Sequence, residues 1–193
     1  QTNITDIYNL GTPTDISAMS GLVSYWRMGD GSTYPTINDE IGSIDGTMTN
    51  MSSANFVADV PPTFNTLSTT FDGIDDYVDV GDNNNLSFGD GSTDSAFSIS
   101  AWIKMTDATR FRVVSKLNGS NAEYGFFTSA SDQLYFALYD NTTSKRISRY
   151  ASSTLTSYEN QWIHLTATYN GSGSGGLKIY LNNTRIDKTT SDV

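Results

Sequence analysis

The stretch AFSISAWIKM, residues 96–105, alternates apolar and polar side chains with a period of two. In an extended chain, the apolar positions of this stretch share one face: Phe97, Ile99, Ala101, Ile103 and Met105. Successive side chains of a β-strand point to opposite faces of a sheet, so the stretch predicts a strand with one buried face.

The same alternation recurs in three later stretches, which are DQLYFALYD (132–140), QWIHLTATYN (161–170) and GLKIYLNN (176–183). Segments rich in Gly, Asn, Ser and Asp separate these stretches, as expected of tight turns between strands. No segment shows a helical stripe, and TPTDISAMSG (12–21) offers at most one helical turn. The pattern predicts an all-β protein built as an antiparallel β-sandwich.

The composition narrows the classes of partner. The chain of 193 residues carries a formal net charge of −10, with 11 Lys and Arg against 21 Asp and Glu. A nucleic-acid binder needs a basic surface, so nucleic acid is not expected as a partner. The sequence has no cysteine and no run of about 18 apolar residues, so we expect neither disulfides nor a membrane span.

Several motifs, taken in order, resemble the LamG-like (laminin G-like) family of concanavalin A-type jelly rolls. They are GLVSYWRMGDG (21–31), STTFDGIDDYVDVGD (68–82), FSISAWIKM (97–105), VVSK (113–116) and NQWIHLTATYNGS (160–172) followed by GLKIYLNNTRI (176–186). The resemblance implies a concanavalin A-like jelly roll over residues 21–193. Residues 1–20 then form an N-terminal tail or connector that resembles the end of a preceding repeat.

The resemblance also implies that the closing strand or strands of the jelly roll are missing after DKTTSDV (187–193). Two explanations stay open. The chain is one slice of a tandem array, or an incomplete sandwich accepts a strand from another subunit, because unpaired strand edges favour strand addition.

The stretch FDGIDDYVDVGD (71–82) places five aspartates in twelve residues. Aspartate supports tight turns by bonding its own backbone, so a turn is the first interpretation, and a cation held by Asp72 or Asp76 is the second. Domains of the resembled type often hold one structural Ca²⁺, which takes six to eight oxygen ligands. By resemblance, the ligands would come from Asp39 and from the backbone around Gly42 and Gly46.

Catalysis is not expected. A glycoside hydrolase needs two carboxylates that flank the scissile bond, and the three glutamates, Glu40, Glu123 and Glu159, show no such setting. His164 is the sole histidine and has no cysteine or second histidine with which to bind zinc. We therefore predict that the protein is not an enzyme.

Carbohydrate binding is the more specific alternative to a purely structural role, because sugar rings stack on exposed aromatic side chains. The strand face opposite the predicted core offers candidate residues for this role: Trp102, Arg112, Tyr135, Tyr139 and Tyr180. The competing interpretation is that these rings pack across strands and serve the sheet itself.

Two functions follow as expectations. The first is a non-catalytic structural or assembly module of a virion or extracellular surface fibre, whose partners are copies of itself or neighbouring structural proteins. IYNLGTPTDIS (7–17) followed by YWRMGDG (25–31) resembles repeats in virion proteins of marine phages. The alternative is a calcium-assisted, glycan-binding adhesin that attaches to surface glycans.

Overall fold

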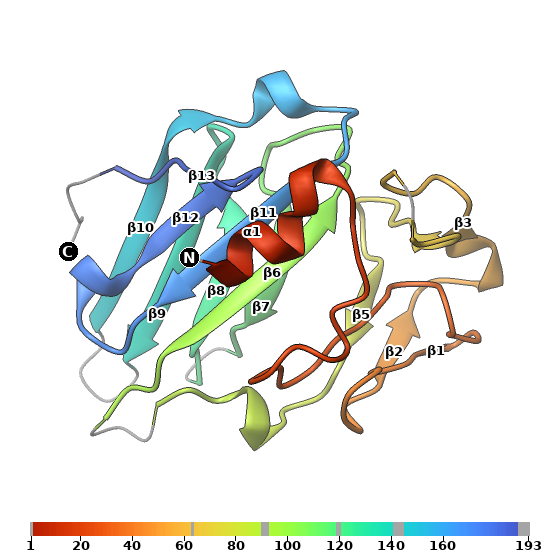
Figure 1. Cartoon of the computed structure of the whole chain (residues 1–193), viewed down its shortest axis with the longest axis horizontal. Coiled ribbons are helices and arrows are strands. Elements are labelled where there is room, and N and C mark those ends of the chain that lie inside the picture. Colours follow the sequence, from red (N-terminus) through yellow and green to blue (C-terminus); the bar gives the residue numbers. More distant parts are fainter. Residues whose placement is uncertain (1, 63, 90–92, 119–120, 141–144, 189–193) are drawn as a thin grey trace. The chain divides into compact units, whose positions relative to one another are not determined.

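The computed structural model describes residues 2–62, 64–89, 93–118, 121–140 and 145–188. The chain divides into two compact units, Thr2–Leu86 and Ser87–Val193, and each is described by itself. Every strand pair is antiparallel, and strands dominate the unit Ser87–Val193, so the predicted all-β class is confirmed (Figure 1).

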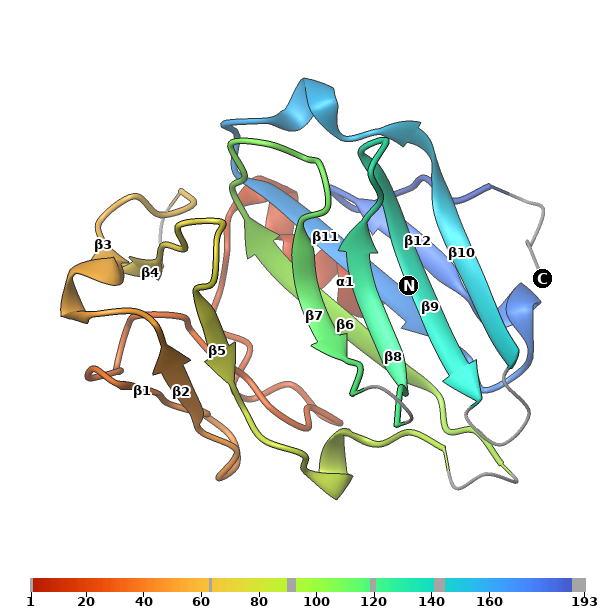
Figure 2. The ribbon, with the colours of Figure 1, turned by 180° about the vertical axis from the view of Figure 1, so that it is seen from behind.

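The unit Ser87–Val193 is a sandwich of two four-stranded sheets (Figures 1 and 2). The first sheet has the order β13-β12-β11-β6, with β6 at Phe97–Ile103, β11 at Ile163–Tyr169, β12 at Lys178–Leu181 and β13 at Thr184–Arg185. The second has the order β10-β9-β8-β7, with β7 at Arg112–Lys116, β8 at Tyr124–Thr128, β9 at Gln133–Asp140 and β10 at Lys145–Thr154.

The core of this unit lies between the two sheets. Its fully buried side chains include Phe126 and Phe136 from one sheet and Ile163, Leu165 and Ile179 from the other. The apolar face predicted for residues 96–105 packs on this core through Phe97, Ile99, Ile103 and Met105. The period-two pattern therefore identified the buried face of β6 correctly.

Residues 184–188 join the two sheets along one edge. Ile186 donates its N–H to Ile179 O (2.9 Å) and accepts from Ser152 N–H (2.8 Å), so it bonds to the β12 side and to the β10 side. The next contact in register is Lys188 N–H to Tyr150 O (3.1 Å). This segment covers part of the β10 edge. The absence of a further closing strand stays a prediction.

The unit Thr2–Leu86 contains a short helix, two small sheets and several turns. Strands β1 (Thr36–Ile37), β2 (Gly46–Thr49) and β5 (Tyr77–Asp79) form a three-stranded sheet in the order β1-β2-β5, and β3 (Phe56–Val57) pairs with β4 (Ser68–Thr69). The core of the unit is small: Ile37, Met48 and Met51 are buried, with Trp26, Met28, Phe56 and Val78 packed against them.

Two details of this unit differ from simple expectation. The helix α1 occupies Thr2–Tyr8 rather than residues 12–21, and a 3₁₀ turn continues it over Asn9–Gly11. The sequence LVSYWRMG (22–29) predicts a strand, but the stretch makes only an isolated bridge, Trp26 with Asp39. No helix in the described part of the chain is long and apolar enough to cross a membrane.

Candidate functional site

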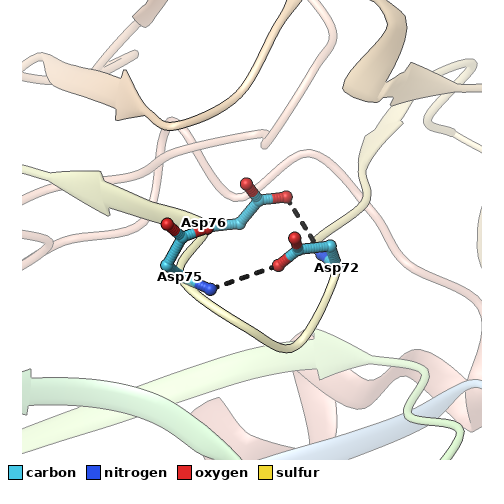
Figure 3. Close-up of side chains that lie close together, drawn as sticks. All are labelled: Asp72, Asp75 and Asp76. Carbon is cyan, nitrogen blue, oxygen red and sulfur yellow. Dashed lines mark hydrogen bonds between the residues drawn. The ribbon is translucent and has the colours of Figure 1, made fainter.

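Two of the five aspartates in residues 71–82, Asp72 and Asp76, hold a turn with their side chains (Figure 3). Asp72 Oδ1 accepts the N–H groups of Ile74 (2.8 Å) and Asp75 (3.3 Å). Gly73, which follows Asp72 in the turn, has a left-handed φ of 75°. Asp76 Oδ2 accepts the N–H of Asp72 (2.9 Å) and closes the turn from the other side. The interpretation of Asp72 and Asp76 as turn-forming residues therefore has a direct structural basis.

The same turn brings the carboxylates of Asp72, Asp75 and Asp76 within 4.8 Å of one another. Backbone N–H groups, first that of Ile74, hold the pKa of the Asp72 carboxyl below its usual value. Asn55 Nδ2 donates to Asp76 Oδ2 (3.2 Å). Two oxygens of the cluster, Asp72 Oδ1 and Asp76 Oδ2, therefore already accept hydrogen bonds. The turn explains the cluster without an ion.

Asp39, the predicted calcium ligand, is 8% exposed and faces backbone donors. Its Oδ1 accepts from Tyr25 N–H (2.9 Å) and Ile41 N–H (3.2 Å), and its Oδ2 accepts from Ile44 N–H (3.3 Å). Burial alone would raise the pKa of Asp39, but these backbone hydrogen bonds outweigh burial, and the pKa lies below its usual value. Both oxygens of Asp39 thus accept backbone N–H groups, which stabilise its negative charge without an ion.

The two glycines of this loop have packing roles in the structure. A Cβ on Gly42 would lie 2.8 Å from Asp39 Oδ2, so glycine lets the loop wrap around the carboxylate. A Cβ on Gly46 would collide with the side chain of Val78 on the neighbouring strand β5. Both positions require glycine for close approach, whether or not their carbonyl groups meet an ion.

We propose that both acidic loops keep their shape without calcium. A bound ion at 100 times its dissociation constant would add about 2.7 kcal/mol to the stability. We therefore expect the midpoint of thermal unfolding, followed by circular dichroism, to be the same in EGTA and in millimolar Ca²⁺. A midpoint that rises by several degrees in calcium, and no longer does so in Asp72→Asn or Asp39→Asn, would contradict the proposal.

The three glutamates are far from the arrangement that glycoside hydrolysis needs. Glu123 pairs with Lys116 (2.6 Å between Oε1 and Nζ), and Glu159 Oε1 accepts the N–H of Ala108 (3.0 Å). Glu40 belongs to the other unit and is exposed. Glu123 thus takes part in an ion pair, Glu159 caps a backbone N–H, and Glu40 lies on the surface of its unit.

His164 is buried at 1% exposure on the face of β11 that points away from the core. Burial lowers its pKa to about 4, so the ring is neutral near pH 7. Its Nε2 lies 2.6 Å from Ser100 Oγ, and the ring packs beside Trp102 with centroids 5.1 Å apart. A buried neutral imidazole is poorly placed to exchange protons with a substrate.

The five predicted carbohydrate-binding residues fall on two different sheets. Trp102 and Tyr180 lie on β6 and β12, and Tyr180 is only 5% exposed. Arg112, Tyr135 and Tyr139 lie on β7 and β9 of the other sheet. The structure therefore does not bring all five residues into one site.

The outer face of the β10-β9-β8-β7 sheet carries a row of side chains in direct cross-strand register. Arg112 on β7 is opposite Phe127 on β8, Phe127 is opposite Tyr135 on β9, and Tyr135 is opposite Tyr150 on β10. The planes of Phe127 and Tyr135 differ by 6° with centroids 6.0 Å apart, and those of Tyr135 and Tyr150 differ by 25° at 5.2 Å. We call these residues, together with Lys188, the aromatic row.

Both ends of the aromatic row are cationic. The Arg112 guanidinium lies over the Phe127 ring at 5.6 Å, and Lys188 Nζ lies over the Tyr150 ring at 4.5 Å. A hollow of about 450 Å³ adjoins the Arg112 end, and its lining residues are Arg110, Arg112, Phe127, Thr128 and Ser129. This volume is within the range of small-ligand sites.

Sequence reasoning found Arg112 and Tyr135 but missed Phe127, Tyr150, Lys188 and Arg110. The missing information was the register between strands, because cross-strand neighbours far apart in the sequence become adjacent only when the hairpins are aligned. Alternation alone assigns each ring to one face of the sheet, but it does not identify the residues beside that ring on the neighbouring strands.

Comparison with known protein families supports the architecture. The family model described as the concanavalin A-like lectin/glucanases superfamily, in its laminin G-type form, matches residues 72–192. A comparison with curated proteins and one with solved structures each found no match.

Because the match covers more than half of the chain, the chain belongs to the concanavalin A-like lectin/glucanase superfamily. Laminin G-like domains of this superfamily are typically extracellular and generally non-catalytic.

Proposed function

We propose that this chain is a non-catalytic module of an extracellular surface or a virion, which acts through the contacts that its sandwich makes. The observation that carries the proposal is the placement of its acid–base groups. Asp39 and Asp72 accept backbone N–H groups, Glu159 caps Ala108, and His164 is buried and neutral. These four side chains serve the fold, and none of them is placed as the acid or base of a hydrolytic pair.

A structural role on a virion or fibre is supported by the sequence resemblance to repeats of phage virion proteins. The sheet order adds a physical route to assembly. Strands β6 and β7 are the outermost strands of their sheets in the described part of the chain. Outermost strands offer backbone groups to a strand of another copy.

The second candidate function is attachment to surface carbohydrate, and the aromatic row favours it. The rings of the row stack on one another across the strands, so the part of the row that offers space to a sugar is the hollow beside Arg112 and Phe127. The row uses its own side chains and needs no calcium.

Incubation of the protein with a panel of neutral and acidic polysaccharides tests the non-catalytic assignment. We expect no release of reducing ends above that of a heat-denatured sample, because Glu123 and Glu159 are held in an ion pair and a backbone cap and the clustered aspartates bond their own turn. Release of reducing ends that disappears in Glu123→Gln or Glu159→Gln would overturn the assignment.

Light scattering of the same sample at increasing protein concentration tests assembly. A molar mass that grows with concentration would support strand addition.

A further inference from the structure

We propose that copies of this chain assemble head to tail, with the acidic turn of one copy bound in the arginine hollow of the next. The acidic turn is residues 71–77 (Figure 3). The arginine hollow is the one lined by Arg110, Arg112, Phe127, Thr128 and Ser129. This inference rests on the structural role proposed above, and it names the two surfaces through which the copies meet.

The acidic turn presents an apolar tip to the solvent. Ile74 is 86% exposed, and Phe71 and Tyr77 on either side of it are 45% and 50% exposed. These are three of the eight large apolar side chains that are exposed in the described part of the chain. Single exposed apolar residues are common on protein surfaces, whereas three within seven residues concentrate apolar surface at one place, as at a contact site.

The acidic turn is also held in one shape. In addition to the bonds that Asp72 and Asp76 make within it, Asn55 Nδ2 donates to Thr70 O (3.0 Å), just before the turn. Asn50 Nδ2 donates to Asp75 O (3.0 Å) from the end of β2. A turn that is already fixed in this way loses little conformational entropy when a partner binds it.

A partner of the tip must carry positive charge. The carboxylates of Asp72, Asp75 and Asp76 lie within 4.8 Å of one another, and among the residues described no lysine or arginine pairs with them. Asp75 bonds the turn through its backbone N–H and carbonyl, which leaves its carboxylate for a partner. Any surface that covers Ile74 therefore meets a concentrated negative charge, and a complementary surface is basic.

The arginine hollow has this charge. Arg110 and Arg112 are both exposed, and within the described ranges neither forms an ion pair. Asp132, the acid of a neighbouring turn, accepts the hydroxyls of Thr109 (2.9 Å) and Thr156 (2.7 Å). The two guanidinium groups are therefore available to carboxylates of another copy, which they can meet with two hydrogen bonds each.

The walls of the arginine hollow suit the apolar tip. The hydroxyls of Thr128 and Ser129 already take part in hydrogen bonds within their own loops. Phe127 and the aliphatic stems of Arg110 and Arg112 supply the apolar part of the lining. The volume of about 450 Å³ is enough for a small ligand, and therefore for the side chain of Ile74.

The two surfaces lie on different units of the chain, the acidic turn in Thr2–Leu86 and the arginine hollow in Ser87–Val193. Each contact between two copies therefore leaves one free turn at one end and one free hollow at the other. Contacts of this kind extend into filaments or close into rings. The net charge of −10 on every copy opposes association, so we expect a weak contact that acts at high local concentration.

Sedimentation velocity of the whole chain, from about 10 μM to about 1 mM, tests the inference over the range of weak contacts. We expect the average mass of the wild type to grow with concentration. A turn variant, Ile74→Ser with Asp75→Lys, and a hollow variant, Arg110→Glu with Arg112→Glu, should each associate at least about tenfold more weakly. All four side chains are exposed, so circular dichroism should show both variants folded.

An equal mixture of the two variants gives the sharpest result. The intact turn of the hollow variant fits the intact hollow of the turn variant, and the remaining two ends are both altered. We therefore expect the mixture to form dimers and no larger species. If a double variant does not fold, Ile74→Ser and Arg112→Ala take its place, and each should weaken association about fivefold.

Two matched controls change the same kinds of residue elsewhere. Glu40→Lys with Ile41→Ser alters an exposed acid and an exposed isoleucine of the same unit as the turn. Arg146→Glu reverses an exposed arginine on β10, in the same sheet as Arg112. Both controls should associate like the wild type.

The remaining outcomes overturn the inference in distinguishable ways. Growth of the wild-type mass that neither variant reduces would assign assembly to other surfaces such as the strand edges, so that the structural role stands and this contact fails. Two monomeric variants whose mixture also stays monomeric would show that the turn and the hollow are not partners. A wild type that is monomeric up to about 1 mM would defeat both the contact and the assembly role, and the hollow would be left to a sugar.

Discussion

Replacing Asp187 with alanine is expected to lower the free energy of unfolding of the sandwich unit by about 3–5 kcal/mol, the usual cost of leaving a buried charge without its partner. The Asp187 side chain is fully buried, and it lies between two arginines. Arg185 meets both of its oxygens at 2.8 Å, and the Nε of buried Arg149 lies 3.9 Å from Oδ2.

The cost is large because Asp187 also organises backbone. Its Oδ1 accepts the N–H of Ile179 (3.1 Å), and the Arg149 guanidinium donates to the carbonyls of Lys188 (2.7 Å) and Ser174 (2.8 Å). Asp187 and its partner Arg149 therefore together fix the segment that joins the two sheets. Urea denaturation followed by tryptophan fluorescence measures the effect.

Arg185→Ala is the matched comparison, since it removes the half-exposed partner and leaves the buried pair. We expect it to cost about 1 kcal/mol, the upper end for an exposed ion pair. The double variant Arg149→Met with Asp187→Ala should recover part of the loss, because it removes the uncompensated charge. An Asp187→Ala variant as stable as Arg185→Ala would show that the cluster contributes little.

Replacing Asp39 with asparagine is expected to lower the free energy of unfolding of the unit Thr2–Leu86 by about 1.5–3 kcal/mol, the range for hydrogen bonds to a charged group. The change keeps the shape of the side chain but turns one acceptor into an NH₂ donor. Whichever way the amide faces, a donor meets the N–H of Ile44 or those of Tyr25 and Ile41. Glu40→Gln, an exposed neighbour, is the control and should change stability by less than about 0.5 kcal/mol.

The same carboxylate predicts a dependence on pH. The pKa of Asp39 is lowered in the folded protein, so its stabilisation is complete above the unfolded value of about 3.9 and is lost as pH falls toward the folded value. The difference in stability between wild type and Asp39→Asn should therefore shrink below about pH 4. A difference that stays constant down to pH 2.5 would mean that the ionised carboxylate is not what holds the loop.

The strands and their buried faces were predictable from the sequence, and the neighbours of each strand were not. Alternation in residues 96–105 and 161–170 marks the faces that pack on the core, because burial on one side of a sheet has a period of two. The helix α1 was missed because its apolar stripe, formed by Ile4, Ile7 and Tyr8, extends over only 7 residues, and short helices depend on tertiary packing more than on local propensity.

The same holds for the candidate sites: contacts between residues close in the sequence were predictable, and contacts between distant residues were not. The turn at Asp72 was predictable, since its bonds reach only two to four residues along the chain. The environment of Asp39 was not, because one of its donors, Tyr25, lies 14 residues away. The aromatic row depends on three separate strand registers, which only the folded sheet reveals.

The account is tested most directly by mapping amide chemical-shift changes while a uronic-acid or sulfated hexasaccharide is added to the isotope-labelled protein. We predict that the largest changes cluster at the residues that line the hollow: Arg110, Arg112, Phe127, Thr128 and Ser129. They should be absent with a neutral hexasaccharide at the same concentration. Changes centred instead on Trp102 and the face of β6 and β11, or no changes at all, would contradict the assignment of the β10-β9-β8-β7 face as the binding surface.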